Sequence, residues 1–339
     1  MAFEMKGNGK LALCVNPMSG RDVRRLAARA ANMTHEAKRD IVARVAAGAD
    51  AVGITDIYVA HEPFRIAEGA LELMPLNANI HIVDIPLTNT AKDTAAAMHL
   101  FKEAGCHTVV SLGGDGTNRA LVRADSAIDL VPISTGTNNV FPTLMEPTLG
   151  GMAAGLNALG KTSGVPESLR PRAKVAHLQT PTQTDIGLID VVLLRRDHVG
   201  NLLPFDADRL DAMLLTRAEP NAVGMSPIGG FIDPVYAHDD NGLWVQMGRD
   251  GQTVRAPLSP GHFRDVAVSH TRRIEFDEML TCSGPGVIAL DGDRDHLLHE
   301  GETASVTVRR DGPRILNVEG IMRWAVRAGM MASAITAET

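Results

Sequence analysis

The chain is poor in cysteine, and its histidines form no recognisable metal motif. Its 3 cysteines, Cys14, Cys106 and Cys282, are odd in number and far apart. Neither a disulfide framework nor a Cys-x-x-Cys metal motif can be read from such spacing. None of the 12 histidines belongs to a His-Glu-x-x-His motif. We therefore expect reduced thiols, a cytoplasmic location and no metal site built from protein side chains alone.

Long apolar runs, an excess of basic residues and a dinucleotide fingerprint are also missing. No apolar run approaches the ~20 residues of a membrane span, and residues 1–10 lack the apolar core of a signal peptide. The formal net charge of −7 argues against nucleic acid as a partner, because binding the phosphate backbone needs clustered Lys and Arg. No Gly-x-Gly-x-x-Gly follows an expected strand, which argues against an NAD-dependent dehydrogenase.

The chain is organised around a glycine-rich loop at residues 113–117, Gly-Gly-Asp-Gly-Thr. A short apolar run precedes the loop and a helix-like segment follows it, a layout that presents backbone N–H groups and a helix N-terminus to a phosphate. Three glycines leave room for a close ligand: Gly113, Gly114 and Gly116. Thr117 offers a hydroxyl donor. A carboxylate would repel phosphate, so we expect Asp115 to accept a proton from an attacking hydroxyl or to hold Mg²⁺. An ordinary Asp-Gly turn is the alternative.

Two further loops also follow expected strands. The first is Asn-Pro-Met-Ser-Gly at residues 16–20, and the second is Ser-Thr-Gly-Thr-Asn-Asn at residues 134–139. Small polar side chains beside a glycine suit the recognition of hydroxyl and phosphate groups. Ligands of parallel sheets bind at the carboxyl ends of the strands, so we expect the three loops to meet along one edge. A plain strand–helix turn is the alternative for each loop taken alone.

The pattern of expected elements indicates a mixed α/β fold in two parts. Strands and helices alternate through residues 1–147, which predicts a doubly wound parallel sheet. From about Lys174 the alternation stops, so residues 148–319 are predicted to form a mostly antiparallel, sandwich-like β domain. The final helix, within residues 320–339, is expected to pack back on the first domain, with a partner-binding helix as the alternative.

Four local predictions are more specific. A helix is expected over residues 21–31, and a second helix is expected to begin at a Thr34 cap and to be closed by Gly48. Residues 186–194 read as a single strand. Asp311-Gly312 is typical of the turn of a β-hairpin, whose strands would be 305–309 and 314–318.

The three loops resemble those of a kinase superfamily that contains the NAD kinases and the diacylglycerol kinases. Gly-Gly-Asp-Gly-Thr is similar to the signature of that superfamily, and residues 20–26, Gly-Arg-Asp-Val-Arg-Arg-Leu, resemble a motif of ATP-NAD kinase-like proteins related to acetoin-catabolism protein X (AcoX). The resemblance implies an NAD kinase-like fold and ATP-dependent phosphoryl transfer to a hydroxyl, with Mg²⁺ accompanying the nucleotide. It also implies a homodimer or homotetramer.

The resemblance implies a role for each loop residue. Asp115 would take the proton of the acceptor hydroxyl, with Gly113, Gly114, Gly116 and Thr117 holding phosphate. The remaining nucleotide-binding candidates are Asn16, Ser19, Gly20, Thr135, Asn138 and Asn139. Candidates for the acceptor side come from three stretches further along the chain: Asp190; Ser226 and Gly229; Asp291 and Asp293.

The stretch expected to grip NAD departs from the pattern of the NAD kinases. Ile189 stands where those proteins carry Asn, and Asp190 stands where they carry Glu. An apolar side chain cannot supply the donor and acceptor of an amide. NAD remains one candidate acceptor, and a related small hydroxyl compound linked to acetoin catabolism is the other.

Two other readings stay open. A nucleotide- or NAD-binding sensor or accessory protein without turnover would explain the altered acceptor stretch, although a pure binder gains nothing from a carboxylate in its phosphate loop. A lipid kinase would need a membrane-facing surface, and no basic amphipathic helix is readable.

Overall fold

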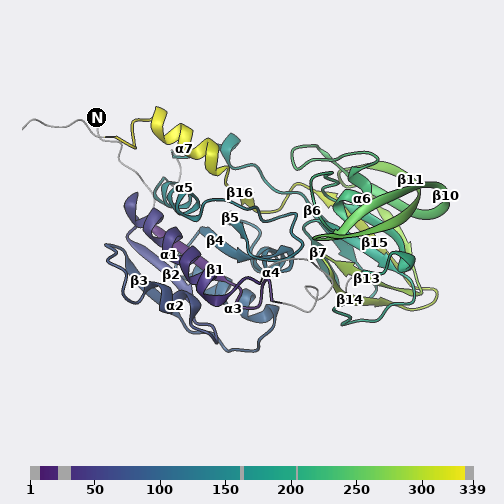
Figure 1. The fold of residues 1–339 in the computed structure, drawn as a ribbon, viewed down its shortest axis with the longest axis horizontal. Coiled ribbons are helices and arrows are strands. Elements are labelled where there is room, and N and C mark those ends of the chain that lie inside the picture. Colours follow the sequence, from purple (N-terminus) through teal and green to yellow (C-terminus); the bar gives the residue numbers. More distant parts are fainter. Residues whose placement is uncertain (1–7, 22–31, 161–163, 204, 333–339) are drawn as a thin grey trace, which may run out of the picture.

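The computed structural model describes residues 8–21, 32–160, 164–203 and 205–332. Figure 1 shows a layered region of helices and strands beside a region made mostly of strands. The helix expected over residues 21–31 falls almost wholly outside the described residues.

A six-stranded sheet forms the centre of the layered region, in the order β16-β5-β4-β1-β2-β3. All of its neighbouring strands pair in parallel, which confirms the expected parallel sheet. Its strands are β1 (Lys10–Val15), β2 (Asp56–Ala60), β3 (Asn79–Val83), β4 (Thr108–Gly113), β5 (Asp129–Ser134) and β16 (Arg314–Ile315). The strand order reverses between β1 and β4, and ligands of such sheets bind beyond the strand ends at this reversal.

Helices cover both faces of the sheet because successive side chains of a strand point to opposite faces. In β1, Leu11 and Leu13 pack with α1, α2, α5 and α7, whereas Ala12 and Cys14 pack with α3 and α4. The helices are α1 (His35–Ala51), α2 (Ile66–Leu71), α3 (Ala91–Glu103), α4 (Asp115–Ala124), α5 (Pro147–Leu159) and α7 (Val318–Arg327). Residues 148–319 were predicted to form the β domain, and they contain β16 and nearly all of α5. Both elements nevertheless pack with the parallel sheet.

Helix α1 begins as expected but ends later than expected. The Thr34 side chain caps it by accepting a hydrogen bond from the Ala37 N–H, whereas the helix continues past Gly48 to Ala51. A Cβ at Gly48 would lie 2.1 Å from the carbonyl oxygen of Thr148 on α5. The expected end at Gly48 is therefore wrong: this glycine allows α1 and α5 to approach closely and does not terminate the helix.

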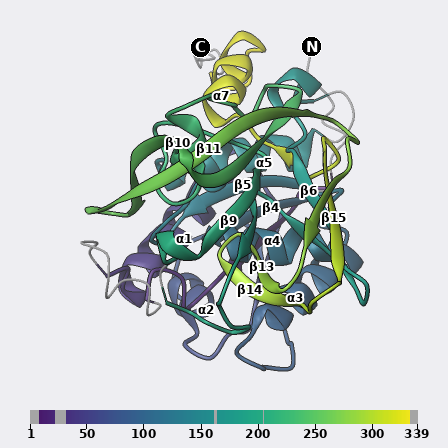
Figure 2. The same cartoon turned by 90° about the vertical axis from the view of Figure 1, so that its right-hand side faces the viewer.

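Two antiparallel sheets form the second region. The larger has the order β11-β10-β9-β8-β13-β14 and the smaller has β12-β15-β6-β7. Side chains from both sheets, among them Leu178, Val191 and Val306, form a common core. Figure 2 faces this region and shows the long β10–β11 hairpin crossing in front of the other strands. The expected mostly antiparallel β region is confirmed.

The elements of the second region have the following bounds. The larger sheet contains β8 (Asp190–Leu194), β9 (Leu210–Leu215), β10 (Asn241–Ser259), β11 (His262–Glu275), β13 (Gly286–Leu290) and β14 (Asp293–Leu298). The smaller contains β6 (Val175–Gln179), β7 (Thr184–Gly187), β12 (Leu280–Ser283) and β15 (Thr303–Arg309). Short helical segments are η2 (Glu167–Leu169), η3 (Ala207–Arg209) and α6 (Ser226–Gly230).

Two local predictions are wrong in this region. Residues 186–194 form not one strand but two, because β7 and β8 belong to different sheets. Asp311-Gly312 does not join a hairpin either, since β15 pairs with β6 and β12 while β16 pairs with β5 of the parallel sheet. The Gly312 N–H donates to the Ala173 carbonyl, so this turn connects the two regions of the chain.

The final helix α7 packs on the parallel sheet. Its buried residues Ile321 and Ala325 join the same core as the inner face of α5. The yellow helix beside α5 in Figure 1 is this segment. The expected packing of the final helix against the first part of the chain is therefore seen in its described residues.

Candidate functional site

The loops that follow β1, β4 and β5 meet at one edge of the parallel sheet and line a cleft. The cleft has a volume of about 310 Å³, the lower end of the range of small-molecule sites. The predicted residues that line it are Asn16, Ser19, Gly20, Gly114, Asp115, Gly116, Thr117, Asn138, Asn139, Asp291 and Asp293. Gly113 and Thr135 do not line it. The structure thus brings the three loops and the Asp291–Asp293 turn together.

Asp115 is the first residue of α4. Its carboxylate accepts hydrogen bonds from the backbone N–H groups of Phe141 (Oδ1, 2.9 Å) and Val140 (3.2 Å to each oxygen). Burial, and then the neighbouring carboxylate of Asp291, raise the pKa of Asp115 to about 7. A carboxylate with this pKa exchanges a proton near neutral pH, as a general base must.

Side-chain hydrogen bonds join the first loop to the other two. The Asn16 Nδ2 donates to the Thr117 Oγ1 at 2.7 Å, and the Ser19 and Thr135 hydroxyls lie 2.7 Å apart. Gly113 lies against the Thr117 side chain: a Cβ at Gly113 would lie 2.4 Å from the Thr117 Cβ. Gly113 and Thr135 therefore position loop residues and do not themselves line the cleft.

Lys38 on α1 supports the first loop, although the sequence analysis did not select it. Its side chain is fully buried, and its Nζ donates to the carbonyl oxygens of Asn16 (2.8 Å) and Pro17 (2.7 Å). A signal was present in the sequence: Lys38 is in helical phase with Ile41, Val42 and Val45, which form the buried face of α1. A lysine on such a face needs buried acceptors.

Asp291 occupies the β13–β14 turn and fixes the backbone between β7 and β8. Its carboxylate accepts the N–H groups of Leu188 (2.8 Å), Ile189 (2.8 Å) and Asp190 (3.2 Å). This contact explains why the expected single strand is broken at that point. Asp291 has a φ of +49°, a left-handed conformation that Asp tolerates better than most residues.

The carboxyl groups of Asp190 and Asp291 lie near Asp115, and the buried guanidinium of Arg119 lies near both of them and near Asp293. Arg119 on α4 is 4% exposed, and its Nη2 lies 3.1 Å from the Asp293 Oδ2. Burial raises the pKa of both Asp190 and Asp291, and Arg119 opposes that rise at Asp291. Arg119 is a further site residue that the sequence analysis missed, and its place one turn after Asp115 was the available signal.

A second, smaller cavity adjoins the cleft, and we call it the small chamber. Its volume is about 60 Å³. Three residues line both the cleft and the chamber: Asp115, Asn138 and Asp291. The other residues of the chamber are Val140, Asp190, Leu203, Phe205, Val223, Gly224, Met225, Leu258, Ser259, Gly292 and Arg294. Asp190 therefore lies in the chamber and not in the cleft.

Ser226 and Gly229 do not line either cavity. The Ser226 Oγ accepts the Glu219 N–H and donates to the Arg217 carbonyl. A Cβ at Gly229 would lie 2.7 Å from a methyl carbon of Leu243, so this glycine allows α6 to pack on β10. A residue that binds the acceptor would have to line the cleft or the small chamber, and neither Ser226 nor Gly229 does.

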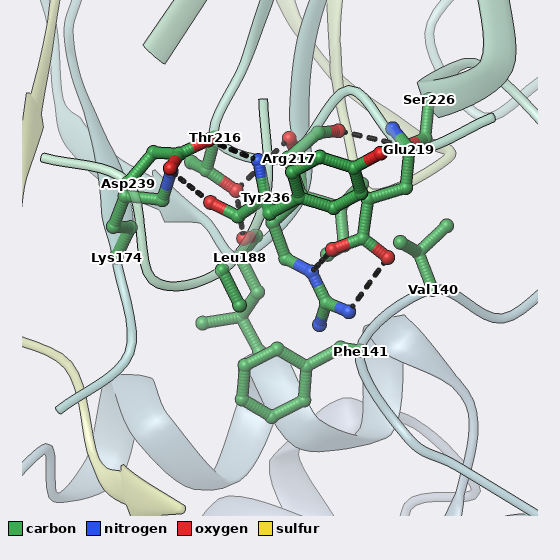
Figure 3. Close-up of polar contacts among 12 residues, drawn as sticks. Val140, Phe141, Lys174, Leu188, Thr216, Arg217, Glu219, Ser226, Tyr236 and Asp239 are labelled. Atoms are coloured by element: carbon green, nitrogen blue, oxygen red, sulfur yellow. Dashed lines mark hydrogen bonds and ion pairs between the residues drawn. The ribbon is translucent and has the colours of Figure 1, made fainter. Parts of the chain in front are cut away.

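Arg217 brings a positive charge from the second region toward Asp115. Its guanidinium pairs with the Glu219 carboxylate at 2.8 Å (Nε–Oε1), and Figure 3 shows it extending toward Phe141. This charge lowers the pKa of Asp115 and partly offsets the effects of burial.

Lys174, also drawn in Figure 3, donates to the Tyr236 and Asn241 carbonyls at 2.8 Å each.

Neither a protein-only metal cluster nor a membrane-crossing helix is found in the described parts of the chain. There, no group of three His, Cys, Asp or Glu side chains is arranged to hold a metal ion. No helix among the same residues is long and apolar enough to cross a membrane.

Comparisons with known proteins agree with this geometry. Residues 174–311 match the family model described as the acetoin catabolism protein X C-terminal domain. The acetoin catabolism protein X of Cupriavidus necator is 29% identical over 340 residues, which cover 95% of this chain and 94% of that protein.

A solved structure gives the same result for the fold. The yeast NADH kinase, crystallised with NADH, aligns with a TM-score of 0.53 and 12% sequence identity over 97% of this chain and 90% of the kinase. At this identity the likeness concerns the fold alone. The family resemblance indicated by the sequence motifs is confirmed: the chain has an NAD kinase-like fold and is similar to acetoin catabolism protein X over nearly its whole length.

Proposed function

We propose that this protein is an ATP-dependent phosphotransferase whose acceptor is a hydroxyl group. The observation that carries the proposal is the position of Asp115, which lines both the cleft and the small chamber. The cleft, formed by glycine-rich loops and the N-terminus of α4, suits the phosphates of a nucleotide. A hydroxyl in the chamber then lies next to the Asp115 carboxylate, which takes its proton during transfer.

The residues present fit ATP with Mg²⁺. Gly114, Gly116 and Thr117 line the cleft, and their backbone N–H groups and the Thr117 hydroxyl are the donors that we expect to hold phosphate. Magnesium in nucleotide sites is held by one or two carboxylates together with phosphate oxygens, and Asp291 and Asp293 offer carboxylates at the cleft. When bound, the ion neutralises charge on the transferring phosphoryl group.

NAD and a small hydroxyl compound are the two candidate acceptors. The likeness of the fold to yeast NADH kinase, which was crystallised with NADH, favours a dinucleotide. The name of the Cupriavidus necator relative, in contrast, links that protein to acetoin catabolism. The replacement of the expected amide by Ile189, which is 1% exposed, favours the small compound. A homo-oligomer and a cytoplasmic location stay predictions.

A second candidate function is a nucleotide-binding sensor or accessory protein. It is favoured by the hydrogen bonds that the Val140 and Phe141 N–H groups donate to Asp115. Through them the carboxylate holds the loop after β5, a structural role that requires no turnover.

The experiment that separates the two functions measures ATP binding and phosphate transfer in the same preparations. Wild-type protein and the Asp115→Asn variant are titrated with ATP and Mg²⁺ by calorimetry, and transfer from γ-labelled ATP to an acceptor panel is then assayed. Binding in both, with transfer in the wild type alone, supports the phosphotransferase. Binding in both without transfer to any acceptor supports the sensor.

A further inference from the structure

Two residues that line the small chamber each carry a buried side-chain oxygen with no hydrogen-bond partner among the described residues. Asp190 is 7% exposed, and its Oδ1 has no partner among the described residues; the Oδ1 of Asn138 has none there either. The Asn138 Nδ2 donates to the Leu258 carbonyl (3.0 Å) and the Ser259 Oγ (3.1 Å). Since a carbonyl oxygen can only accept, the contact with Leu258 orients the amide with its NH₂ group toward these partners and leaves its own oxygen free. Buried oxygens without partners are unfavourable, so a ligand that donates hydrogen bonds fits the chamber.

The volume of the chamber limits the size of that ligand. A cavity needs roughly 10–15 Å³ to hold a single water molecule, and the chamber has about 60 Å³. This is far below the roughly 300–1,000 Å³ of typical small-molecule pockets, so the chamber suits a ligand of only a few non-hydrogen atoms. A ribose that carries a nicotinamide ring is larger than this.

The walls of the chamber determine the rest of its chemistry. Apolar side chains form one part of the wall: Val140, Phe205, Val223, Met225 and Leu258. The carboxyl groups of Asp115, Asp190 and Asp291 form another part. A ligand that matches both parts has a short carbon skeleton and hydroxyl groups, and an anion is disfavoured beside three carboxyl groups.

Given the phosphotransferase activity proposed above, we propose that the small chamber is the acceptor site and that the acceptor is a short-chain diol. One hydroxyl of the diol lies at Asp115, the second pairs with the free oxygens of Asp190 and Asn138, and the apolar wall contacts the carbon chain. In the reaction, the first hydroxyl oxygen forms a bond to the γ-phosphorus of ATP. The bond from that phosphorus to the bridging oxygen of ADP breaks, and the hydroxyl proton passes to Asp115.

The protonation of Asp190 is compatible with this assignment. Burial, and then Asp291 and Asp115, raise the pKa of Asp190. A hydroxyl both donates and accepts hydrogen bonds, so it pairs with a carboxylate or with a protonated carboxyl group. The pairing with a diol therefore does not depend on the charge of Asp190.

Arg294 fixes one wall of the chamber. It is 3% exposed, its Nε lies 2.7 Å from the Asp197 Oδ2, and its guanidinium lies over the Phe205 ring at 4.4 Å. A wall held by a buried ion pair does not widen easily, which makes the size limit a property of the fold.

The test assays transfer from γ-labelled ATP to 1,2-propanediol, 2,3-butanediol, glycerol and NAD. Two variants change the chamber: Asp190→Asn removes the carboxyl group, and Val223→Phe reduces the volume. The matched control is Asp265→Asn, because Asp265 is exposed on β11, away from the chamber. Thermal unfolding confirms that each variant folds, and calorimetry measures the Kd for ATP.

We expect the short diols to be labelled and NAD to remain unlabelled. Val223→Phe raises the KM for the diol at least tenfold, and Asp190→Asn, whose amide can still pair with a hydroxyl, raises it by a smaller factor. Both variants leave the Kd for ATP unchanged and retain a measurable kcat. Asp265→Asn changes neither constant. Labelling of NAD alone, or equal diol KM values in the chamber variants and the wild type, overturns the assignment of the chamber while the phosphotransferase stands.

The phosphotransferase function and the assignment of the chamber as a diol site can be refuted independently of each other. Saturation-transfer NMR measures the binding of 1,2-propanediol without any turnover. If no acceptor is labelled but the diol binds to the wild type and not to Val223→Phe, the phosphotransferase is overturned and the chamber remains a diol site. If the diol neither binds nor becomes labelled, the diol site is overturned.

Discussion

The Nη2 of Arg119 on α4 lies 3.1 Å from the Oδ2 of Asp293 on β14. This ion pair joins the helix that begins with Asp115 to the hairpin that carries Asp291 at its turn. The two carboxyl groups that line both cavities thus come from opposite regions of the chain, and a buried guanidinium holds those regions in register. The site exists only where the parallel sheet and the β-rich region meet.

Replacing Arg119 with Met is expected to lower the free energy of unfolding by about 1–3 kcal/mol, because Asp291 and Asp293 lose a charged partner. The pKa of Asp291 should rise further, since the charge of Arg119 opposes that rise together with the backbone hydrogen bonds to Asp291. Urea denaturation at pH 7 measures the change. Arg123→Met is the control on the same helix: its side chain is 48% exposed, and its buried partner Asp185 keeps His296 at 2.9 Å. A loss of about 1 kcal/mol or less is therefore expected. Equal losses in the two variants would contradict the role of Arg119.

Replacing Asp115 with Asn should make the protein more stable near neutral pH. The folded state holds a proton at Asp115 up to a pKa of about 7, whereas the ordinary value is 3.8. Between these values the folded state binds more protons than the unfolded state, so the stability of the wild type falls as the pH rises from 4 to 7. The variant lacks this contribution and retains an oxygen for the Val140 and Phe141 N–H groups.

The expected gain of the Asp115→Asn variant over the wild type is about 1–3 kcal/mol at pH 8, and it should shrink toward pH 4. Thermal unfolding at a series of pH values measures it. A variant that is less stable than the wild type at pH 8 would mean that the carboxylate is needed for the loop after β5.

Replacing Gly151 with Ala should separate α1 from α5. A Cβ at Gly151 would lie 2.0 Å from the Val45 carbonyl oxygen, a backbone atom that cannot turn aside. The expected loss is about 1–3 kcal/mol, typical of an overpacked core. Gly69→Ala on α2 is the matched control: its nearest neighbour is the flexible side chain of Arg39 at 3.5 Å, so the helix propensity of Ala should make that variant neutral or slightly more stable.

Replacing Lys38 with Met should weaken nucleotide binding indirectly, through the loop that carries Asn16 and Pro17. The change leaves the Asn16 and Pro17 carbonyl oxygens without this donor, at a cost of about 1–3 kcal/mol in stability. Asn16 then loses its fixed position beside Thr117, and the Kd for ATP rises. Lys102→Met is the control, because that side chain is 57% exposed. An unchanged Kd for ATP in the Lys38→Met variant would show that the first loop does not need this support.

The parallel sheet was predictable from the sequence because its signals are local. Apolar strands, capped helices such as that of Thr34, and loops rich in glycine each lie within a few residues of one another. The same signals placed the loops at one edge of the sheet, since the carboxyl ends of parallel strands meet there.

The wrong predictions depend on contacts distant in the sequence. Gly48 has the local pattern of a helix end, and nothing near it in the sequence indicates that Thr148 approaches it. Asp311-Gly312 has the residues of a hairpin turn, but β16 finds its partner in β5, far away along the chain. The break between β7 and β8 likewise depends on Asp291, about one hundred residues later.

The candidate site was predictable on its nucleotide side and much less so on its acceptor side. Gly-Gly-Asp-Gly-Thr is a contiguous motif, so its residues could be selected together. The small chamber, by contrast, combines Asp190, Leu258 and Phe205, three residues from separate strands and loops without a shared pattern. Arg119 and Lys38 are buried charges whose partners only the fold reveals.

The most direct test of the account is phosphate transfer from γ-labelled ATP with Mg²⁺, measured in the wild type and in the Asp115→Asn variant. The account predicts a labelled hydroxyl compound with the wild type, a rate at least about 100-fold lower in the variant, and the same Kd for ATP in both. Transfer that continues undiminished in the variant would contradict the role of Asp115 as the proton acceptor.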